Sequence, residues 1–176
     1  MRYLPNGKQM SEADAHTIHE IGIPSLVLME RAALQIVETM HKKNISTEKS
    51  LIVCGSGNNG GDGFAVARLL TEQGKHAEVL FAGKEASLSE ECRCQKQIVE
   101  NMGISVFTEF PDEEYTVIID AVFGVGLCRE ITGHYKDVID WMNLQDAEKV
   151  AVDIPSGICA ATGKILGTAF RADLTI

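Results

Sequence analysis

The chain has 176 residues, of which 45% are hydrophobic and 23% charged, and its formal net charge is −9. This composition is that of a folded globular domain and excludes a disordered or collagen-like chain. No Lys/Arg run is longer than Lys42-Lys43, so the charges also argue against a nucleic acid or an anionic membrane surface as partner. Any phosphate group must therefore be held mainly by backbone N–H groups or by a metal ion.

The first 45 residues predict a helical extension. Ser11 and Asp14 resemble a capping box that would begin a short helix, Gly22 would end it, and Pro24-Ser25 would begin a second helix. Apolar residues recur at helical spacing in the second segment: Leu26, Met29, Ala33, Ile36, Val37 and Met40. We expect this face to pack on a sheet or on another subunit.

From residue 50 onward, short apolar runs alternate with amphipathic stretches. The predicted strands are 51–54, 77–82, 104–107, 116–119, 150–152 and 174–176, and the predicted helices are 63–73, 88–102 and 135–143. Continuous apolar strands that alternate with helices are typical of a parallel sheet covered on both faces. The prediction is a single α/β domain over 1–176, with a Rossmann-like, doubly wound and mostly parallel sheet in a core over 50–176.

The cysteines and the lack of long apolar segments indicate the cellular compartment of the protein. The five cysteines form no CxxC pair, and no histidine lies at zinc-ligand spacing from any of them, which indicates reduced thiols. The beginning of the chain has no apolar signal-peptide core, and no segment is apolar for long enough to span a membrane. We therefore expect a cytoplasmic protein, or an organellar one after loss of a transit peptide.

The segment after the first predicted strand, Gly55–Gly63, combines five glycines with polar side chains. Gly55, Gly57 and Gly60 satisfy GxGxxG, the pattern that brings backbone N–H groups against a pyrophosphate. The second strand ends without the acidic residue that reads a ribose in redox dinucleotide sites, which disfavours an oxidoreductase. Oxygen atoms of Asn58, Asn59 and Asp62 suit a hard cation. The alternative is a plain turn with Asp62 as N-cap of the next helix.

Two carboxylates follow later strands and should reach the same edge of the sheet. Asp120 ends one strand and Asp153 follows another, so together they could clamp a cation, share a proton, or do both, although each could instead cap a local turn. Ser156 is disfavoured as a nucleophile, because there is no GxSxG elbow and no histidine near a strand end. His16 and His19 have metal-ligand spacing but no third ligand nearby, so we interpret them as surface residues.

Four blocks together resemble the NAD(P)H-hydrate epimerase family, the YjeF N-terminal domain. They are Leu28-Met29-Glu30-Arg31-Ala32, the NNGGDG of 58–63, Asp120-Ala-Val-Phe-Gly-Val-Gly and Asp153-Ile-Pro-Ser-Gly, in family order over nearly the whole chain. The resemblance implies an isomerase that interconverts the R and S forms of NADHX and NADPHX, which are nicotinamide cofactors hydrated at ring atom C6. It also implies a homodimer and a fused or separate ADP- or ATP-dependent dehydratase as partner.

The resemblance further implies the site residues. Substrate would be bound by Asn58, Asn59, Gly60, Gly61 and Asp62, by Gly124, Val125, Gly126, Leu127, Cys128, Arg129 and Glu130, and by Asp153. A potassium ion (K⁺) would be held by Asn59, Asp120 and Ser156. The reaction needs proton transfer at oxygen, for which Asp153 is the first candidate and Asp120 the second, because a carboxylate bound to an ion donates a proton poorly.

Two departures and two rival functions accompany this prediction. Residues 127–130 are a local variant of the family pattern, and the chain stops at its last strand, so we expect a domain truncated at its C-terminal end. One rival is a non-catalytic nucleotide-binding domain that acts through protein contacts. The other is an NAD(P)-dependent oxidoreductase.

Overall fold

The protein is described from a computed structural model that places residues 7–176. A sheet of six strands, all paired in parallel, has the order β3-β2-β1-β4-β5-β6. The strands are β1 (Lys49–Cys54), β2 (His76–Phe81), β3 (Val106–Phe107), β4 (Val117–Ala121), β5 (Glu148–Ala151) and β6 (Leu174–Thr175). The strand order reverses at the junction of β1 and β4: β2 and β3 follow on one side of it, and β5 and β6 on the other. The predicted doubly wound, Rossmann-like α/β class is confirmed.

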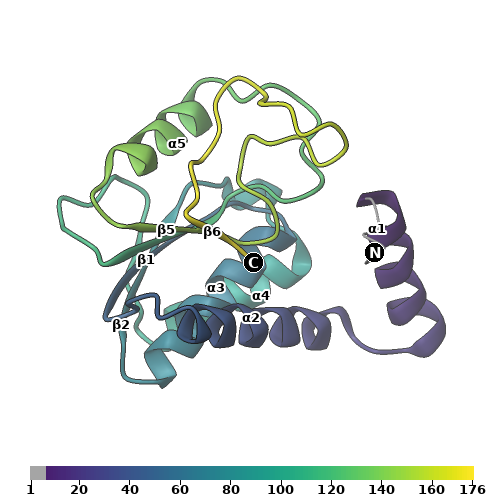
Figure 1. Cartoon of the computed structure of the whole chain (residues 1–176). Coiled ribbons are helices and arrows are strands. Elements are labelled where there is room, and N and C mark those ends of the chain that lie inside the picture. Colours follow the sequence, from purple (N-terminus) through teal and green to yellow (C-terminus); the bar gives the residue numbers. More distant parts are fainter. Residues whose placement is uncertain (1–6) are drawn as a thin grey trace.

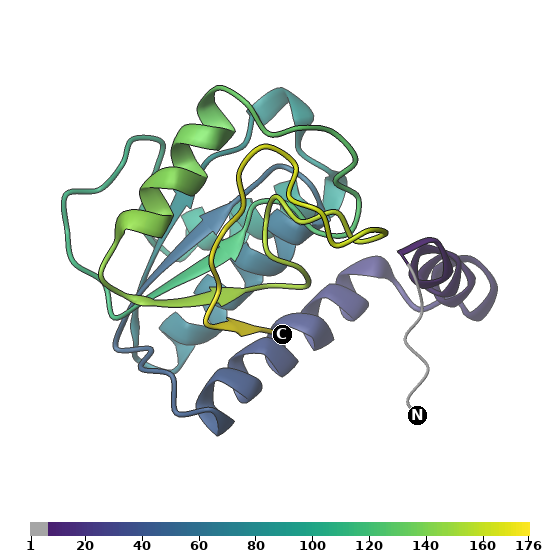
Figure 2. The same cartoon turned by 45° about the horizontal axis from the view of Figure 1, so that its top comes forward.

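Helices cover both faces of the sheet, as Figures 1 and 2 show. The helices α2 (Ser25–Lys42), α3 (Asn58–Glu72) and α4 (Glu90–Asn101) lie on one face, and α5 (His134–Leu144) lies on the other. Alternate strand residues divide between two cores: Ile52 and Cys54 join the first, whereas Leu51 and Val53 join the second. The apolar runs that predicted the strands are therefore buried on both sides.

The N-terminal helices follow the prediction in part. Of the predicted apolar face of α2, all but Leu26 are buried; Leu26 is 36% exposed. The helix α1 (Gly7–His16) runs into a π-helical turn, η1 (Thr17–Ile21), and Gly22 ends it with φ of 83°. The predicted capping box at Ser11 is wrong, because α1 begins at Gly7 and Ser11 lies inside it.

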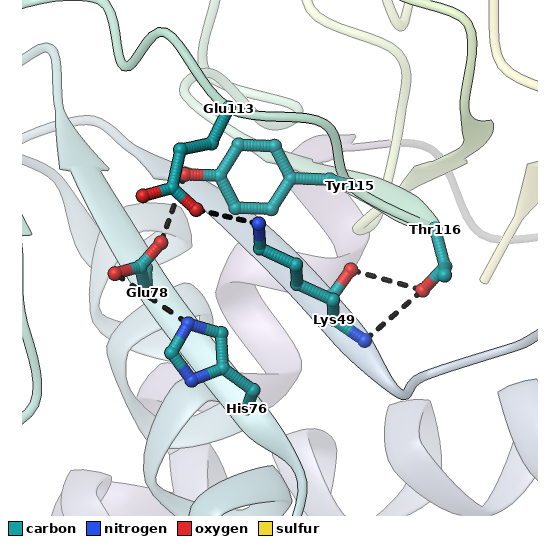
Figure 3. A network of polar contacts seen from close by, with 6 residues as sticks. All are labelled: Lys49, His76, Glu78, Glu113, Tyr115 and Thr116. Carbon is teal, nitrogen blue, oxygen red and sulfur yellow. Dashed lines mark hydrogen bonds and ion pairs between the residues drawn. The ribbon is translucent and has the colours of Figure 1, made fainter.

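A polar network joins the strands at the edge opposite to their carboxyl ends (Figure 3). The Tyr115 hydroxyl donates to the buried Glu78 carboxylate at 2.9 Å, and His76 lies 3.6 Å from the other oxygen of that carboxylate. Lys49 pairs with Glu113 and lies 5.2 Å from the centre of the Tyr115 ring. These contacts fix the beginnings of β1 and β2 relative to the segment before β4.

Three smaller findings concern the thiols, a short turn before α4 and the length of the helices. Each of the five cysteines is a free thiol; Cys54 and Cys92 are buried, and Cys128 is exposed. A short 3₁₀ turn, η2 (Glu85–Ser87), precedes α4. Between residues 7 and 176, no helix combines the length and the apolar character that a bilayer crossing requires.

Candidate active site

A cavity of about 940 Å³ lies at the carboxyl ends of the strands. It is bounded by α1, α2, the first turns of α3, and the loops after β4 and β5. Its lining comprises Met10, Ser11, Asp14, Ala32, Gln35, Ile36, Ser56, Gly57, Asn58, Asn59, Asp62, Val122, Phe123, Gly124, Val125, Gly126, Leu127, Cys128, Arg129, Val152, Asp153 and Ile176. This volume is at the upper end of the range usual for small-molecule sites.

The cavity brings together most of the predicted substrate residues from three separate segments. Asn58, Asn59 and Asp62 meet residues 124–129 and Asp153 there. Five predicted site residues are not part of the lining: Gly60, Gly61, Asp120, Glu130 and Ser156. Their roles stay predictions, and for Asp120 and Ser156 the structure offers a position just beneath the cavity.

The glycine-rich segment is helical rather than a loop. Gly57 is the N-cap of α3, so the helix begins at Asn58 and not at the predicted residue 63. The alternative that made Asp62 the N-cap is therefore wrong. Gly60 allows this start, because a Cβ atom on it would lie 2.0 Å from the carbonyl oxygen of Gly55. The first N–H groups of α3, which an α-helix leaves without intrahelical partners, and the positive end of the helix dipole lie at the cavity, a suitable arrangement for an anion.

Asp120 and Ser156 form a closed hydrogen-bond unit at the end of β4. The Asp120 carboxylate accepts hydrogen bonds from the Ser156 hydroxyl at 2.7 Å, the Ser156 N–H at 2.7 Å and the Val122 N–H at 3.1 Å. The Phe123 N–H in turn donates to the Ser156 hydroxyl at 2.8 Å. Complete burial raises the pKa of Asp120 to about 6, against the opposing effect of these hydrogen bonds.

Asp153 has a different environment at the rim of the cavity. Its backbone is left-handed, with φ of 69°, a conformation that few residues other than glycine adopt. Its exposed carboxylate accepts one hydrogen bond, from the Val125 N–H at 2.9 Å. Gly124 leaves room for it, since a Cβ atom there would lie 2.6 Å from the carboxylate. The carboxylate is therefore held in place and still open to a ligand.

Asp62 lies on the first turns of α3 and lines the same cavity. Burial raises the pKa of Asp62 to about 7, and the negative charges of Asp153 and Asp14 add to the shift. A carboxyl group that titrates near neutral pH in a cavity is a common feature of active sites. The sequence places Asp62 in the substrate segment, but neither this titration nor the nearness of Asp14 could be read from it.

The side-chain amide of Asn59 has polar atoms that a bound cation or ligand could pair with. Within residues 7–176, its buried Oδ1 and Nδ2 atoms have no hydrogen-bond partner. An unsatisfied buried acceptor is costly unless a ligand or water pairs with it. Asp120, Ser156 and Asn59 offer oxygen atoms of the kind that hard cations prefer, so these residues fit such an ion. In the part of the chain that the structure describes, no group of three or more His, Cys, Asp or Glu residues is placed to hold a metal ion.

The fold and the cavity define the class of protein: a Rossmann-like α/β protein with a cavity where the strand order reverses, the place where such folds usually bind ligands. A family model described as YjeF-related protein N-terminus matches residues 25–176. The chain belongs to this family, and the predicted family is confirmed.

Relatives and one solved structure support the same assignment. A protein of Oenococcus oeni named NAD(P)H-hydrate epimerase is 42% identical over 173 residues, which cover 97% of this chain and 82% of the relative. A protein of Limosilactobacillus reuteri with the same name is 44% identical over 175 residues, 98% of this chain and 82% of the relative. The crystal structure of yeast YNL200c is 20% identical and has a TM-score of 0.85, over 99% of this chain and 79% of that one, so it supports the fold.

Proposed function

We propose that this protein is an NAD(P)H-hydrate epimerase, an isomerase that interconverts the R and S forms of NADHX and NADPHX. The observation that carries the proposal is that all four sequence blocks of the family border one cavity or lie directly beneath it. The names of the relatives described above support the same reaction. The boundaries of the single domain stay a prediction.

The pyrophosphate of the substrate would lie at the N-terminus of α3. Unpaired helix N–H groups and the helix dipole favour an anion at this place. Among the cavity-lining residues of the described range 7–176, Arg129 is the only Lys or Arg, which agrees with a site that relies on backbone donors. Residues 58–62, 124–130 and Asp153 would form the contacts with the rest of the dinucleotide.

A potassium ion would be held by Asn59, Asp120 and Ser156. When bound, it would supply positive charge next to the pyrophosphate in a chain that has few cations there. The unpartnered Oδ1 of Asn59 could then coordinate the ion, and its unpartnered Nδ2 could donate to a phosphate oxygen. Burial disfavours the ionised form of Asp120, as its raised pKa shows. A nearby cation would offset this effect by stabilising the carboxylate, which agrees with the proposed role.

Epimerisation at C6 can proceed by loss of its hydroxyl and return of water to the other face. The C6–O bond breaks as the oxygen takes up a proton and the ring nitrogen forms an iminium bond to C6; water then adds, and its proton passes to a base. Ring opening is the second route, and it also needs proton transfer at oxygen. Asp153 would carry this proton, because its carboxylate is exposed in the cavity and has one hydrogen-bond donor. Asp120 is fully buried beneath the lining and would position the ion instead.

Three further parts of the proposal concern the cellular setting. We infer a cytoplasmic location and a partner dehydratase, fused or separate, that consumes the S form. We also infer a homodimer through the N-terminal helices, because Leu26, Val27 and Leu34 on α2 and Ile21 before it are exposed. Exposed apolar side chains of this kind are a usual feature of subunit contacts.

One coupled assay separates the proposed function from its rivals. R-NADPHX is mixed with an S-specific dehydratase, and NADPH recovery is followed by absorbance in potassium or sodium buffer. We expect this protein to accelerate recovery, more so with potassium. Failure to accelerate, with retained binding of NADPHX, would instead indicate a non-catalytic binding domain. Consumption of NAD(P)H with a carbonyl substrate would indicate an oxidoreductase.

A further inference from the structure

The helix α1 forms one wall of the cavity, although it lies before the residues that the family model matches. Met10, Ser11 and Asp14 occupy one side of α1 and line the cavity. They face the first turns of α3 and the loop after β4. None of the four sequence blocks contains these residues, and the established family assignment gives them no role.

Packing alone does not explain why α1 is held there. None of its ten residues, all within the described part of the chain, is buried. It connects to α2 through a five-residue π-helical turn and the left-handed Gly22, and Figure 2 shows it standing apart from the sheet. Gly7 approaches Val125 at the other side of the cavity, where a Cβ atom would be 3.6 Å from the Val125 Cβ. Isolated helices shorter than about 12 residues are marginal in water, so a ten-residue helix without a core contact needs another source of stability.

The position of Asp14 indicates which part of the ligand it meets. Asp14, Asp62 and Asp153 line the same cavity, and the charges of Asp153 and Asp14 add to the rise that burial causes in the pKa of Asp62. Asp153 is the proposed proton carrier, which places the reacting ring at this end of the cavity. The phosphates would lie at the first N–H groups of α3, where Asn58 begins the helix, and near Arg129. A carboxylate is a strong acceptor for ribose hydroxyls and amide N–H groups.

We propose that α1 is a substrate-binding wall, in which Asp14 accepts a hydrogen bond from a hydroxyl or carboxamide N–H of the hydrated nicotinamide riboside, and Met10 packs against it. Binding of the dinucleotide then holds α1 in place. This inference rests on the proposed function for its choice of ligand. It adds a carboxylate that replaces, from another element, the ribose-reading acid missing at the end of β2.

Steady-state kinetics with matched variants tests the contact. Asp14→Asn should raise the KM for R-NADPHX about tenfold, the effect of losing one hydrogen bond to a charged group. Glu12→Gln is the control, because Glu12 lies on the same helix, pairs with Lys8 at 3.7 Å and does not line the cavity; its kinetics should match those of the wild type. Met10→Ala should raise the KM with the same unfolding temperature, since Met10 is exposed. An unchanged or lower KM in Asp14→Asn would overturn the proposal.

Hydrogen exchange of residues 7–16 gives a readout that does not need turnover. An equilibrated mixture of R- and S-NADPHX, without dehydratase, should slow exchange in α1 of the wild type and slow it less in Asp14→Asn. Exchange that is the same with and without the mixture would contradict the inference. Protection that rises with protein concentration in the absence of ligand would show that a second copy covers α1. If the wild type fails to epimerise, the proposed function fails, whereas protection by NADPHX would still support the contact.

Discussion

The buried Asp120 leads to a prediction about pH and stability. The pKa of Asp120 is about 6 in the folded chain, against an ordinary value of 3.8. Ionising this carboxyl group therefore costs about 3 kcal/mol more in the folded chain than in the unfolded chain. Below pH 3.8 the group is protonated in both the folded and the unfolded chain. As the pH rises toward 6, the unfolded chain releases this proton first, so the stability that the raised pKa provides is lost. Of the total, about 1.4 kcal/mol is lost between pH 5 and pH 8.

The matched substitution is Asp120→Asn, which is neutral at every pH. We expect the free energy of unfolding of the wild type, minus that of Asp120→Asn, to fall by about 1.4 kcal/mol from pH 5 to pH 8 in buffer without potassium. Urea unfolding at a series of pH values measures this difference, in which contributions from other groups cancel. Potassium should reduce the fall, because a cation stabilises the ionised carboxylate. A difference that stays constant or rises with pH would refute the reasoning.

Three other substitutions test separate parts of the structure. Asp153→Asn should lower the epimerisation rate by about a hundredfold or more, with Asp112→Asn as an exposed control, and an unchanged rate would rule Asp153 out as the proton carrier. Gly124→Ala should also lower that rate, since its Cβ atom would lie 2.6 Å from the Asp153 carboxylate; full activity would show that Asp153 can shift without loss. Tyr115→Phe should lower the free energy of unfolding by about 1–3 kcal/mol in urea, because buried Glu78 loses its donor, and should leave the rate unchanged. A large loss of rate in Tyr115→Phe would mean that the two edges of the sheet are coupled.

The sequence predicted the sheet well because its signal is local. Runs such as Val117–Ile119 are apolar at every position, which is what a strand buried on both faces requires. The start of α3 was predicted too late, because asparagine and glycine are weak helix formers. Contact of Gly60 with Gly55 overrides that preference, and such packing depends on the folded arrangement.

The candidate site was predictable only where its residues follow strands. The carboxyl ends of parallel strands meet at one edge, so Asp120 and Asp153 could be expected near residues 58–62. The contribution of Met10, Ser11 and Asp14 was missed, since helical spacing in α1 says nothing about which distant loops it faces. In the structure Asp14 lines the cavity and adds to the pKa of Asp62, which burial raises most, and both effects exist only after folding.

The two aspartates that follow strands look alike in the sequence, and their surroundings separate their roles. Asp120 is fully buried and receives three hydrogen bonds, so its carboxyl group is fixed in position. Whether it is ionised depends on whether a cation lies beside it. Asp153 is exposed and receives one, from Val125, which is why we propose it as the proton carrier. A neutral amide at each position therefore has a different consequence. Asp120→Asn should change stability and the response to potassium, whereas Asp153→Asn should change the rate of epimerisation and leave the potassium response of stability intact.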